Sequence, residues 1–284
     1  MNFKKLLLAS LCLLFITTSQ AQQKITGNKK GDITVLWGWN RGWFTNSDIH
    51  FRGDSYDFTL TDVVAKDRQT KFDPAIYFHP QWITIPQTNF RIEYFHKDNY
   101  SMSLGVDHMK YVARSGQAVK ISGIIENSGT IYDGVYNNKT VLLEEFFLEF
   151  EHTDGLNYIN AEIRRFDDLF AFHKSIKMNL FYGTGIGFIY PKTNSLLLNN
   201  DRYDQFNLAG YGLHALFGVG FTFFKHLIIK TELKGGYVNM SNIRTTLNKS
   251  DSASQSFFFG QYNFSLGGSF NLCENNQKKK KSIA

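Results

Sequence analysis

Apolar and polar residues alternate one by one along most of this chain. In the clearest stretch one face carries Tyr262, Phe264, Leu266, Gly268, Phe270 and Leu272, and the other carries Gln261, Asn263, Ser265, Gly267, Ser269 and Asn271. A helix would scatter both sets around its circumference, so a period of two predicts a β-strand. Large aromatic residues on one face and small polar residues on the other fit a barrel with lipid outside and a narrow polar interior.

The same alternation predicts seven further strands. Their apolar faces are Ile33, Val35, Trp37, Trp39, Trp43, Ile49 and Phe51; Phe90, Ile92 and Tyr94; Met102, Leu104 and Val106; Phe146, Leu148, Phe150, Ile159, Ala161 and Ile163; Ile176, Met178, Leu180, Tyr182, Ile186, Phe188 and Tyr190; Tyr211, Leu213, Ala215, Phe217, Val219, Phe221 and Phe223; Leu227, Ile229, Thr231, Leu233 and Tyr237. Glycine falls repeatedly on the opposite face of the last four strands, as expected where side chains crowd the axis of a small barrel.

One of these segments changes the parity of its apolar residues. Phe150 belongs to an even-numbered set and Ile159 to an odd-numbered set, with Gly155 between them. One extra residue in a β-bulge would produce this change, and glycine is common in such bulges. We therefore predict one long bulged strand from Leu143 to Phe166.

The connections between the predicted strands alternate strictly in length. The short ones are His96 to Tyr100, Asp167 to His173 and one around Lys225; the long ones are Thr61 to Pro86, Val112 to Leu142, Pro191 to Phe206 and Asn239 to Ser254. A soluble β-sandwich gives no reason for this segregation. It is typical of an all-β, up-and-down transmembrane barrel, here of eight antiparallel strands, with short periplasmic turns and four long outer loops.

The N-terminal segment has the layout of a secretory signal peptide. Lys4 and Lys5 precede an apolar run from Leu6 to Ile16, and Ser19-Gln20-Ala21 places small residues before a cleavage point. We expect residues 1–21 to be removed and the protein to reach the outer membrane of a Gram-negative cell. Residues 22–31 then form a short N-terminal segment, 32–272 the barrel and 273–284 a polar basic tail.

Composition and charge exclude several classes of protein. The chain is 43% hydrophobic and 20% charged, which excludes a disordered chain, and its 2 cysteines exclude a disulfide scaffold. The net charge of +6 arises from the signal lysines and from Lys278 to Lys281. Because the body between them is formally neutral, we expect no nucleic-acid partner.

The chain resembles the small eight-stranded outer-membrane β-barrel proteins of Gram-negative bacteria. The resemblance covers Asp32 to Leu272 and rests on the signal peptide, the alternation, the loop asymmetry and the final strand Tyr-x-Phe-x-Leu-x-Gly-x-Phe-x-Leu. That strand is similar to the signal read by the barrel-assembly machinery, which is therefore an implied partner. Such signals usually end the chain, whereas twelve residues follow Leu272 here. The resemblance implies a broad class and no particular activity.

Charged residues are predicted on the inner face of the barrel. They are Arg91, Glu93, Asp107, Glu149, Glu151, Glu162, Arg164, Lys177, Lys230, Glu232 and Lys234. An eight-stranded barrel is just wide enough to be filled by side chains. Buried charges persist when they are paired, so an interior salt-bridge network without a pore is one interpretation. A narrow or gated path for small or apolar solutes is the other.

Three polar clusters are candidate sites. The first is Asn40-Arg41 with Ser47, Asp48 and His50 further along the strand; the second is Asp107-His108-x-Lys110; the third is Glu151-His152-Thr153-Asp154-Gly155. Parity places His50 inward near the outer rim and places His108 and His152 on the lipid side. Asn40, Asp48, His50, Asp107 and His108 are the predicted binding residues. No third ligand accompanies any pair of metal-binding residues, so we expect no metal and no cofactor.

The third cluster suggests an enzymatic hypothesis. His152, held by Glu151 or Asp154, would act as a general base on a lipid ester at the bilayer surface. This looks like the outer-membrane lipid A deacylases, which are also eight-stranded barrels and use a His-x-Ser pair. Asp154 stands where their serine would fall, and Thr153 is one residue too early. The alternative interpretation is interfacial anchoring and bulge geometry.

The long loops offer a second place for function. The loops Asp62 to Pro86 and Ser115 to Asn138 carry Tyr77, Phe78, Trp82, Tyr132 and Tyr136 among polar residues. Such loops could bind a surface ligand, because function concentrates on loops held by rigid scaffolds, or could pack on themselves as caps. The sequence thus predicts a structural or surface-binding barrel in contact with outer-membrane lipids and lipopolysaccharide. A lipid hydrolase and a narrow conduit are the alternatives.

Overall fold

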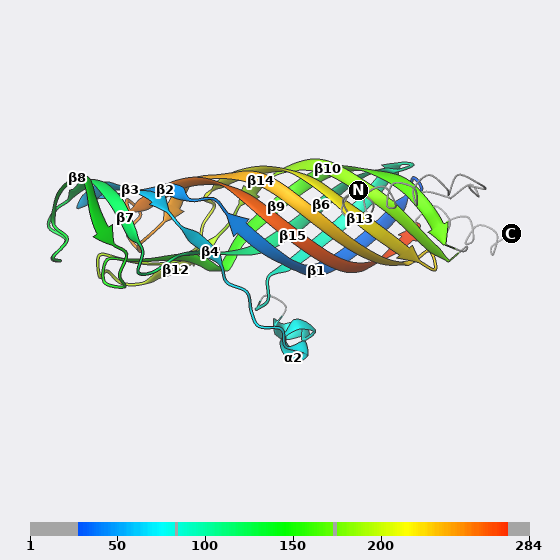
Figure 1. Cartoon of the computed structure of the whole chain (residues 1–284), viewed down its shortest axis with the longest axis horizontal. Coiled ribbons are helices and arrows are strands. Elements are labelled where there is room, and N and C mark those ends of the chain that lie inside the picture. The colour runs from blue at the N-terminus through cyan, green and yellow to red at the C-terminus, as the bar shows by residue number, and fades with distance from the viewer. Residues whose placement is uncertain (1–27, 83–84, 173–174, 272–284) are drawn as a thin grey trace, which may run out of the picture.

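Eight long antiparallel strands close into a barrel (Figure 1). The computed structural model describes residues 28–82, 85–172 and 175–271, so the predicted signal peptide and basic tail lie outside the described residues. The ring is β1 (Asp32–Phe44), β5 (Thr88–Lys97), β6 (Tyr100–Ala113), β9 (Leu148–Phe172), β10 (Ile176–Ile189), β13 (Gly210–Phe223), β14 (Leu227–Arg244) and β15 (Ser252–Asn271). β1 pairs with β15 along its whole length and closes the ring. The predicted eight-stranded barrel is confirmed.

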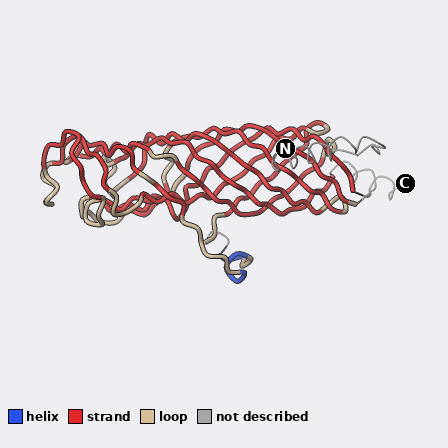
Figure 2. Tube along the Cα trace, viewed as in Figure 1, coloured by secondary structure: helices blue, strands red, loops and turns tan. Residues whose placement is uncertain are grey.

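Shorter strands extend the barrel at the end where the long connections lie (Figure 2). They are β2 (Ser47–Gly53), β3 (Tyr56–Val63), β4 (Ala65–Asp67), β7 (Ala118–Ile125), β8 (Gly134–Leu142), β11 (Lys192–Leu197) and β12 (Tyr203–Phe206). β2 pairs with β15 and β11 pairs with β9, so this extension continues the barrel wall. Two short helices, α2 (Pro74–Tyr77) and η1 (Pro80–Trp82), lie in the connection between β4 and β5.

A belt of exposed apolar side chains surrounds the ring. It includes Phe90, Ile92, Tyr94, Met102, Leu104, Ile163, Tyr182, Ile186, Phe188, Tyr190, Tyr211, Leu213, Phe217, Leu227, Leu233, Tyr262 and Phe270. A membrane-crossing strand needs about 9–11 residues, and on β9 the belt includes the outward residues Ile159, Ala161 and Ile163. Among the described residues no helix has the length and hydropathy needed to cross a membrane.

The extension has a hydrophobic core of its own. Aromatic and aliphatic side chains of β2, β3, β6, β7, β9 and β15 meet there with Phe147, which precedes β9; those of the strands include Ile49, Phe51, Phe58, Leu60, Met109, Tyr111, Ile121, Phe150 and Phe257. Tyr132 of the β7–β8 connection and Tyr136 of β8 pack against this core. Much of the long connections therefore forms packed β-structure.

The first predicted strand is two strands in the structure. β1 ends at Phe44 and β2 begins at Ser47, and the two-residue break reverses which parity faces inward. Ile49 is fully buried in the core of the extension, whereas His50 is half-buried on the outside, contrary to the prediction. The alternation is unbroken in sequence because lipid outside β1 and a hydrophobic core inside β2 both select apolar residues.

The predicted bulge in β9 is present but preserves the direction of the side chains. The strand spans Leu148 to Phe172, so it begins and ends later than predicted. Leu156 pairs with Met109 and His152 with Tyr111, which leaves two extra residues on β9 instead of one. Even-numbered residues therefore face inward on both sides of Gly155, whose φ is 134°. Phe150 is apolar because the interior of the extension is apolar.

Candidate functional site

The middle of the barrel holds a balanced set of buried charges. Arg91, Arg164, Lys230 and Lys234 are the cations, and Glu93, Asp107, Glu162 and Glu232 are the anions; each is at most 6% exposed. They come from β5, β6, β9 and β14, and the inward direction predicted for all eight is confirmed. Because the cations and anions are equal in number, every group can stay ionised while the lumen carries no net charge from this set.

Glu162 is the centre of this network. Its Oε2 lies 2.8 Å from Arg91 Nη1 and accepts from Arg164 Nε at 2.6 Å. Its Oε1 lies 3.0 Å from Lys234 Nζ and 2.9 Å from His214 Nε2. A carboxylate that contacts three cations and an imidazole ties β5, β9, β13 and β14 together across the lumen.

The remaining charges pair at both sides of this centre. Lys234 Nζ also donates to Asp107 Oδ2 at 2.5 Å. Lys230 Nζ donates to Glu93 Oε2 at 2.6 Å, and Arg164 Nη2 lies 2.8 Å from Glu232 Oε2. This geometry supports the interpretation of an interior network without a pore.

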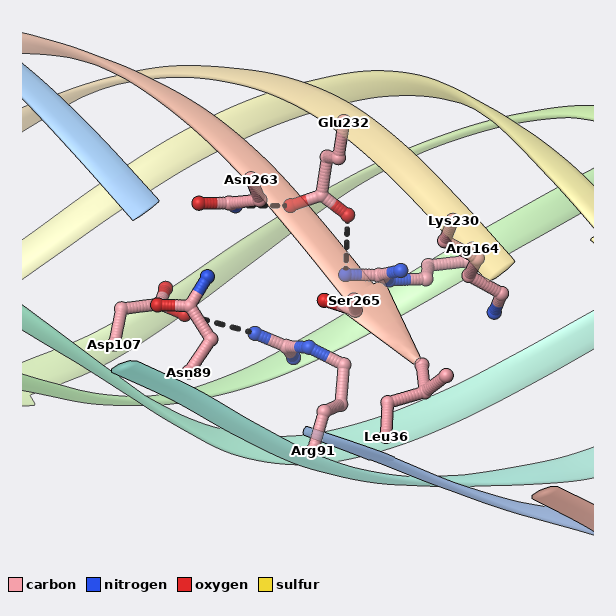
Figure 3. Close-up of a pocket in the computed structure, with 9 residues that line it drawn as sticks. All are labelled: Leu36, Asn89, Arg91, Asp107, Arg164, Lys230, Glu232, Asn263 and Ser265. Carbon is pink, nitrogen blue, oxygen red and sulfur yellow. Dashed lines mark hydrogen bonds and ion pairs between the residues drawn. The ribbon is translucent and has the colours of Figure 1, made fainter. Parts of the chain in front are cut away.

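The charged layer encloses only a small space (Figure 3). The cavity is about 20 Å³ and is lined by Leu36, Asn89, Arg91, Asp107, Arg164, Lys230, Glu232, Asn263 and Ser265. That volume is about enough for one water molecule. Asn263 Nδ2 donates to Glu232 Oε1 at 2.8 Å beside it.

Apolar layers lie on both sides of the charges. Towards the short turns, Phe95, Phe166, Phe181 and Leu216 form a buried cluster, and Lys230 Nζ lies 4.7 Å from the ring centroid of Phe166. Towards the long connections lies the core of the extension. The described part of the lumen is therefore filled at three successive levels.

Glycines on the inner face leave room for the network. A Cβ on Gly105 would lie 2.7 Å from the guanidinium carbon of Arg91. A Cβ on Gly185 would lie 2.6 Å from Glu162 Cγ and equally close to His214 Cε1. Crowding at the barrel axis, predicted from the glycine pattern, is confirmed at these positions.

Two charges predicted on the inner face lie on the outer wall instead. Glu149 pairs with Arg202, and Glu151 Oε2 lies 3.0 Å from Arg68 Nη1. Both are odd-numbered residues of β9, and the two-residue bulge leaves odd residues facing outward. Lys177, on β10, is partly buried.

His152 faces the interior and is fully buried, contrary to its predicted position on the lipid side. Its Nδ1 shares a 3.1 Å hydrogen bond with Thr193 Oγ1 on β11, and its ring lies 5.6 Å from that of Tyr111 and 5.1 Å from that of Phe150. It lies seven residues before Ile159, the first belt residue of β9. Burial lowers the pKa of His152 to about 3, so the imidazole is neutral.

The predicted catalytic cluster does not assemble around His152. Glu151 Oε1 accepts from Thr153 Oγ1 at 2.9 Å on the outer wall. Asp154 Oδ2 lies 2.9 Å from Lys192 Nζ and is exposed. Within the described part of the chain His152 Nε2 has no hydrogen-bond partner. Glu151 and Asp154 are thus both engaged with other side chains.

The structure joins some predicted binding residues through the lumen. Asn40 Nδ2 donates to Asn89 Oδ1 at 2.5 Å and to the carbonyl oxygen of His108 at 3.2 Å. Asp107 belongs to the charged network. His108 faces outward as predicted but is only 6% exposed, and its Nδ1 lies 2.8 Å from Asn157 Oδ1.

The other predicted binding residues lie on the extension. His50 Nε2 is 2.7 Å from Asp57 Oδ1 across the β2–β3 hairpin. Asp48 Oδ1 accepts from the backbone N–H of Asp62 at 2.9 Å in the same hairpin. These contacts hold the hairpin together, and neither residue faces the lumen.

His214 and Tyr158 are members of the site that pattern reasoning missed. Tyr158 OH lies 2.8 Å from His214 Nδ1, so the pair extends the network from Glu162 to β13. A signal for His214 was present. It is the one large polar side chain in an inner row otherwise formed by Gly210, Gly212, Leu216, Gly218 and Gly220.

A polar depression of about 330 Å³ lies on the extension. It is lined by Asp54, Ser55, Tyr56, Asn200, Asp201, Thr246, Leu247, Asn248 and Asp251, from the β2–β3, β11–β12 and β14–β15 connections. Asn248 Nδ2 donates to Asp54 Oδ2 at 3.2 Å, which joins two of these connections. Among the described residues no group of three histidine, cysteine or acidic side chains is placed to hold a metal ion.

Comparisons with known proteins find similarity of fold only. No family model and no curated protein matches the sequence. Among solved structures, outer membrane protein OprG from Pseudomonas aeruginosa is 10% identical with a TM-score of 0.42, covering 87% of this chain and 99% of its own. Ail, the attachment invasion locus protein of Yersinia pestis, is 10% identical with a TM-score of 0.33, covering 85% and 100%. The outer membrane protease OmpT from Escherichia coli is 6% identical with a TM-score of 0.26, covering 85% and 96%.

These values are too low to transfer any activity to this chain. The closed ring and its apolar belt carry the assignment instead, because a closed barrel leaves no unpaired strand edge in lipid. The chain is a closed eight-stranded β-barrel whose outer wall is suited to lipid.

Proposed function

We propose that this barrel displays its extension at the cell surface for binding, and that it neither conducts solutes nor catalyses a reaction. The observation that carries the proposal is the filling of the lumen at three levels below an extension that has its own core. A filled barrel is a rigid support, and the extension is a surface built on it. The extension would face outward, since long connections of such barrels lie on the outer side.

The polar depression is the place on this surface where a small polar ligand fits best. Its carboxylate and amide groups could accept from and donate to adjacent hydroxyls, as sugar recognition requires. Three acidic residues, Asp54, Asp201 and Asp251, make a neutral or cationic sugar a better ligand than an anionic one.

Glycan-array binding by the folded protein tests this proposal. We expect Asp54→Ala with Asp201→Ala to weaken binding, because both side chains are exposed at the lining of the depression. Glu126→Ala, which changes an exposed acidic residue beside β7, is the matched control. Binding of no glycan, or equal binding by both variants, would argue against a sugar site here.

Neither alternative has a specific observation in its favour. A conduit would give discrete openings in planar bilayers, and we expect none from the folded protein. A hydrolase would change the acyl chains of outer-membrane lipids in a way that depends on His152. Mass spectra of lipids from cells expressing the protein or its His152→Ala variant should be identical.

A further inference from the structure

One segment leaves the extension and projects from the barrel, whose outer wall it contacts through Trp39. It is the connection from Arg68 to Trp82, which contains α2 and η1 and projects beside the wall near β1 (Figure 1). We call residues 72–82 the aromatic foot. The ring of Phe78 packs on the indole of Trp39 with centroids 5.4 Å apart, and that of Tyr77 lies 5.9 Å from the same indole.

Trp39 places the foot at the level of the lipid belt. It lies on the outward face of β1, paired with Phe264 of β15, and the two rings stack 6.4 Å apart. Trp43 lies four residues nearer to the rim on the same face. The foot therefore folds back from the extension to the level of Trp39, beside the lipid belt.

The foot presents apolar rings that no part of the described protein covers. Phe72 is 70% exposed, Phe78 56% and Trp82 44%. From Phe72 to Trp82 the titratable charged side chains are limited to Asp73 and the imidazole of His79, and Asp73 Oδ1 accepts from the N–H of Ala75 at 2.9 Å. In water such a cluster would be costly, but beside the belt it continues an existing apolar surface.

The backbone of the foot is also suited to lipid. Every N–H from Ala75 to Trp82 has an acceptor within the foot, and Pro80 has no N–H. Examples are Phe78 N to the oxygen of Pro74 at 3.1 Å and Trp82 N to that of His79 at 3.1 Å. A segment that enters a bilayer must pair its backbone N–H groups internally, because lipid offers no hydrogen-bond partners.

Charge fixes the depth of the foot. Lys71 immediately precedes it and is exposed, whereas Arg68, four residues before it, is held by Glu151 at 3.0 Å. Basic side chains beside an apolar, aromatic segment match the headgroup level of a leaflet with anionic phosphates. We propose that the aromatic foot inserts into the outer leaflet, with Phe72, Phe78 and Trp82 among the upper acyl chains and Lys71 at the phosphates.

This proposal rests on the membrane placement of the barrel but is separable from the proposed ligand site. The foot would act as a second anchor that limits rotation and tilt of the barrel. Because it is attached to the connection that follows β4, it would also fix the height of the extension above the leaflet.

Spin labels in vesicles test the insertion. Single cysteines at Phe78, Ile186 and Lys249 are labelled in a Cys273→Ser background, in vesicles of phosphatidylcholine and phosphatidylglycerol. Ile186 belongs to the lipid belt, and Lys249 is exposed at the extension. Migration on unheated gels confirms that each variant is folded. The measurement is the ratio of collision rates with oxygen and with a water-soluble nickel chelate.

We expect a ratio at Phe78 that is several-fold above that at Lys249 and close to that at Ile186. A ratio at Phe78 equal to that at Lys249, with Ile186 still in lipid, would overturn the foot proposal and leave the barrel placement intact. A water-like ratio at Ile186 would overturn both.

Discussion

At the scale of single residues, the charge network behaves as one unit in which each member needs its partners. Lys234 contacts both Asp107 and Glu162 and is 2% exposed. Removing one member of a buried pair leaves an uncompensated charge, which is far more costly than the absence of the whole pair.

We therefore predict that Lys234→Met lowers the free energy of unfolding by about 3–5 kcal/mol, the range for broken buried ion pairs. Lys66→Met changes an exposed residue of β4 and should cost less than about 0.5 kcal/mol. Urea-dependent unfolding in detergent micelles measures both. Equal free energies of unfolding for the two variants would contradict a stabilising role of the charge network.

His152 predicts a dependence on acid. Its pKa is about 3 in the folded protein because burial disfavours the charged form, against about 6.5 in the unfolded chain. Between these values the unfolded chain binds more protons, so stability is full above about pH 6.5 and falls as the pH drops towards 3.

Hydrogen exchange of the amides around Thr193 should therefore accelerate at about pH 4 relative to pH 7, after correction for intrinsic rates. His152→Gln removes the titrating group and should weaken this acceleration. An unchanged acceleration in the variant would assign the effect to other groups.

At the scale of elements, the same alternation has opposite meanings in β1 and β2. Trp37 and Trp39 face outward to the belt, while Ile49 faces inward to the core of the extension. The reversal depends on a break at Thr45 and Asn46. Neither residue type indicates a strand break in the sequence.

We predict that Ile49→Ala costs about 2–5 kcal/mol of local stability, as for other buried aliphatic truncations. His50→Ala, its neighbour on the exposed face, should have a much smaller effect. Limited proteolysis of the extension in folded protein distinguishes them, with faster cleavage expected for Ile49→Ala only. Faster cleavage of His50→Ala than of Ile49→Ala would instead support the inward direction of His50 that the sequence predicts.

At the scale of the whole molecule, the three filled layers are arranged in series. Opening one layer leaves the other two in place, so no single substitution should create a channel. We predict that Phe181→Ala, in the layer near the short turns, and Phe257→Ala, in the core of the extension, both leave planar-bilayer conductance undetectable. Discrete openings from either variant would show that the lumen depends on one gate.

The sequence by itself determined the barrel, its strand number and the inward position of the eight paired charges. These features depend on a period of two that lipid and a narrow lumen enforce residue by residue, as from Phe90 to Tyr94 on β5. Local pattern is enough where the environment on each face stays the same along a strand.

Only the tertiary structure decided where the environment changes. His152 is buried because β11 covers it and a two-residue bulge keeps its direction, and neither fact is written in its neighbours. The foot contacts Trp39 through a connection that folds back on the wall. The alternation of apolar and polar residues shows only which face of a strand meets an apolar surface. It cannot show whether that surface is lipid outside the barrel or protein core inside it, because both are apolar.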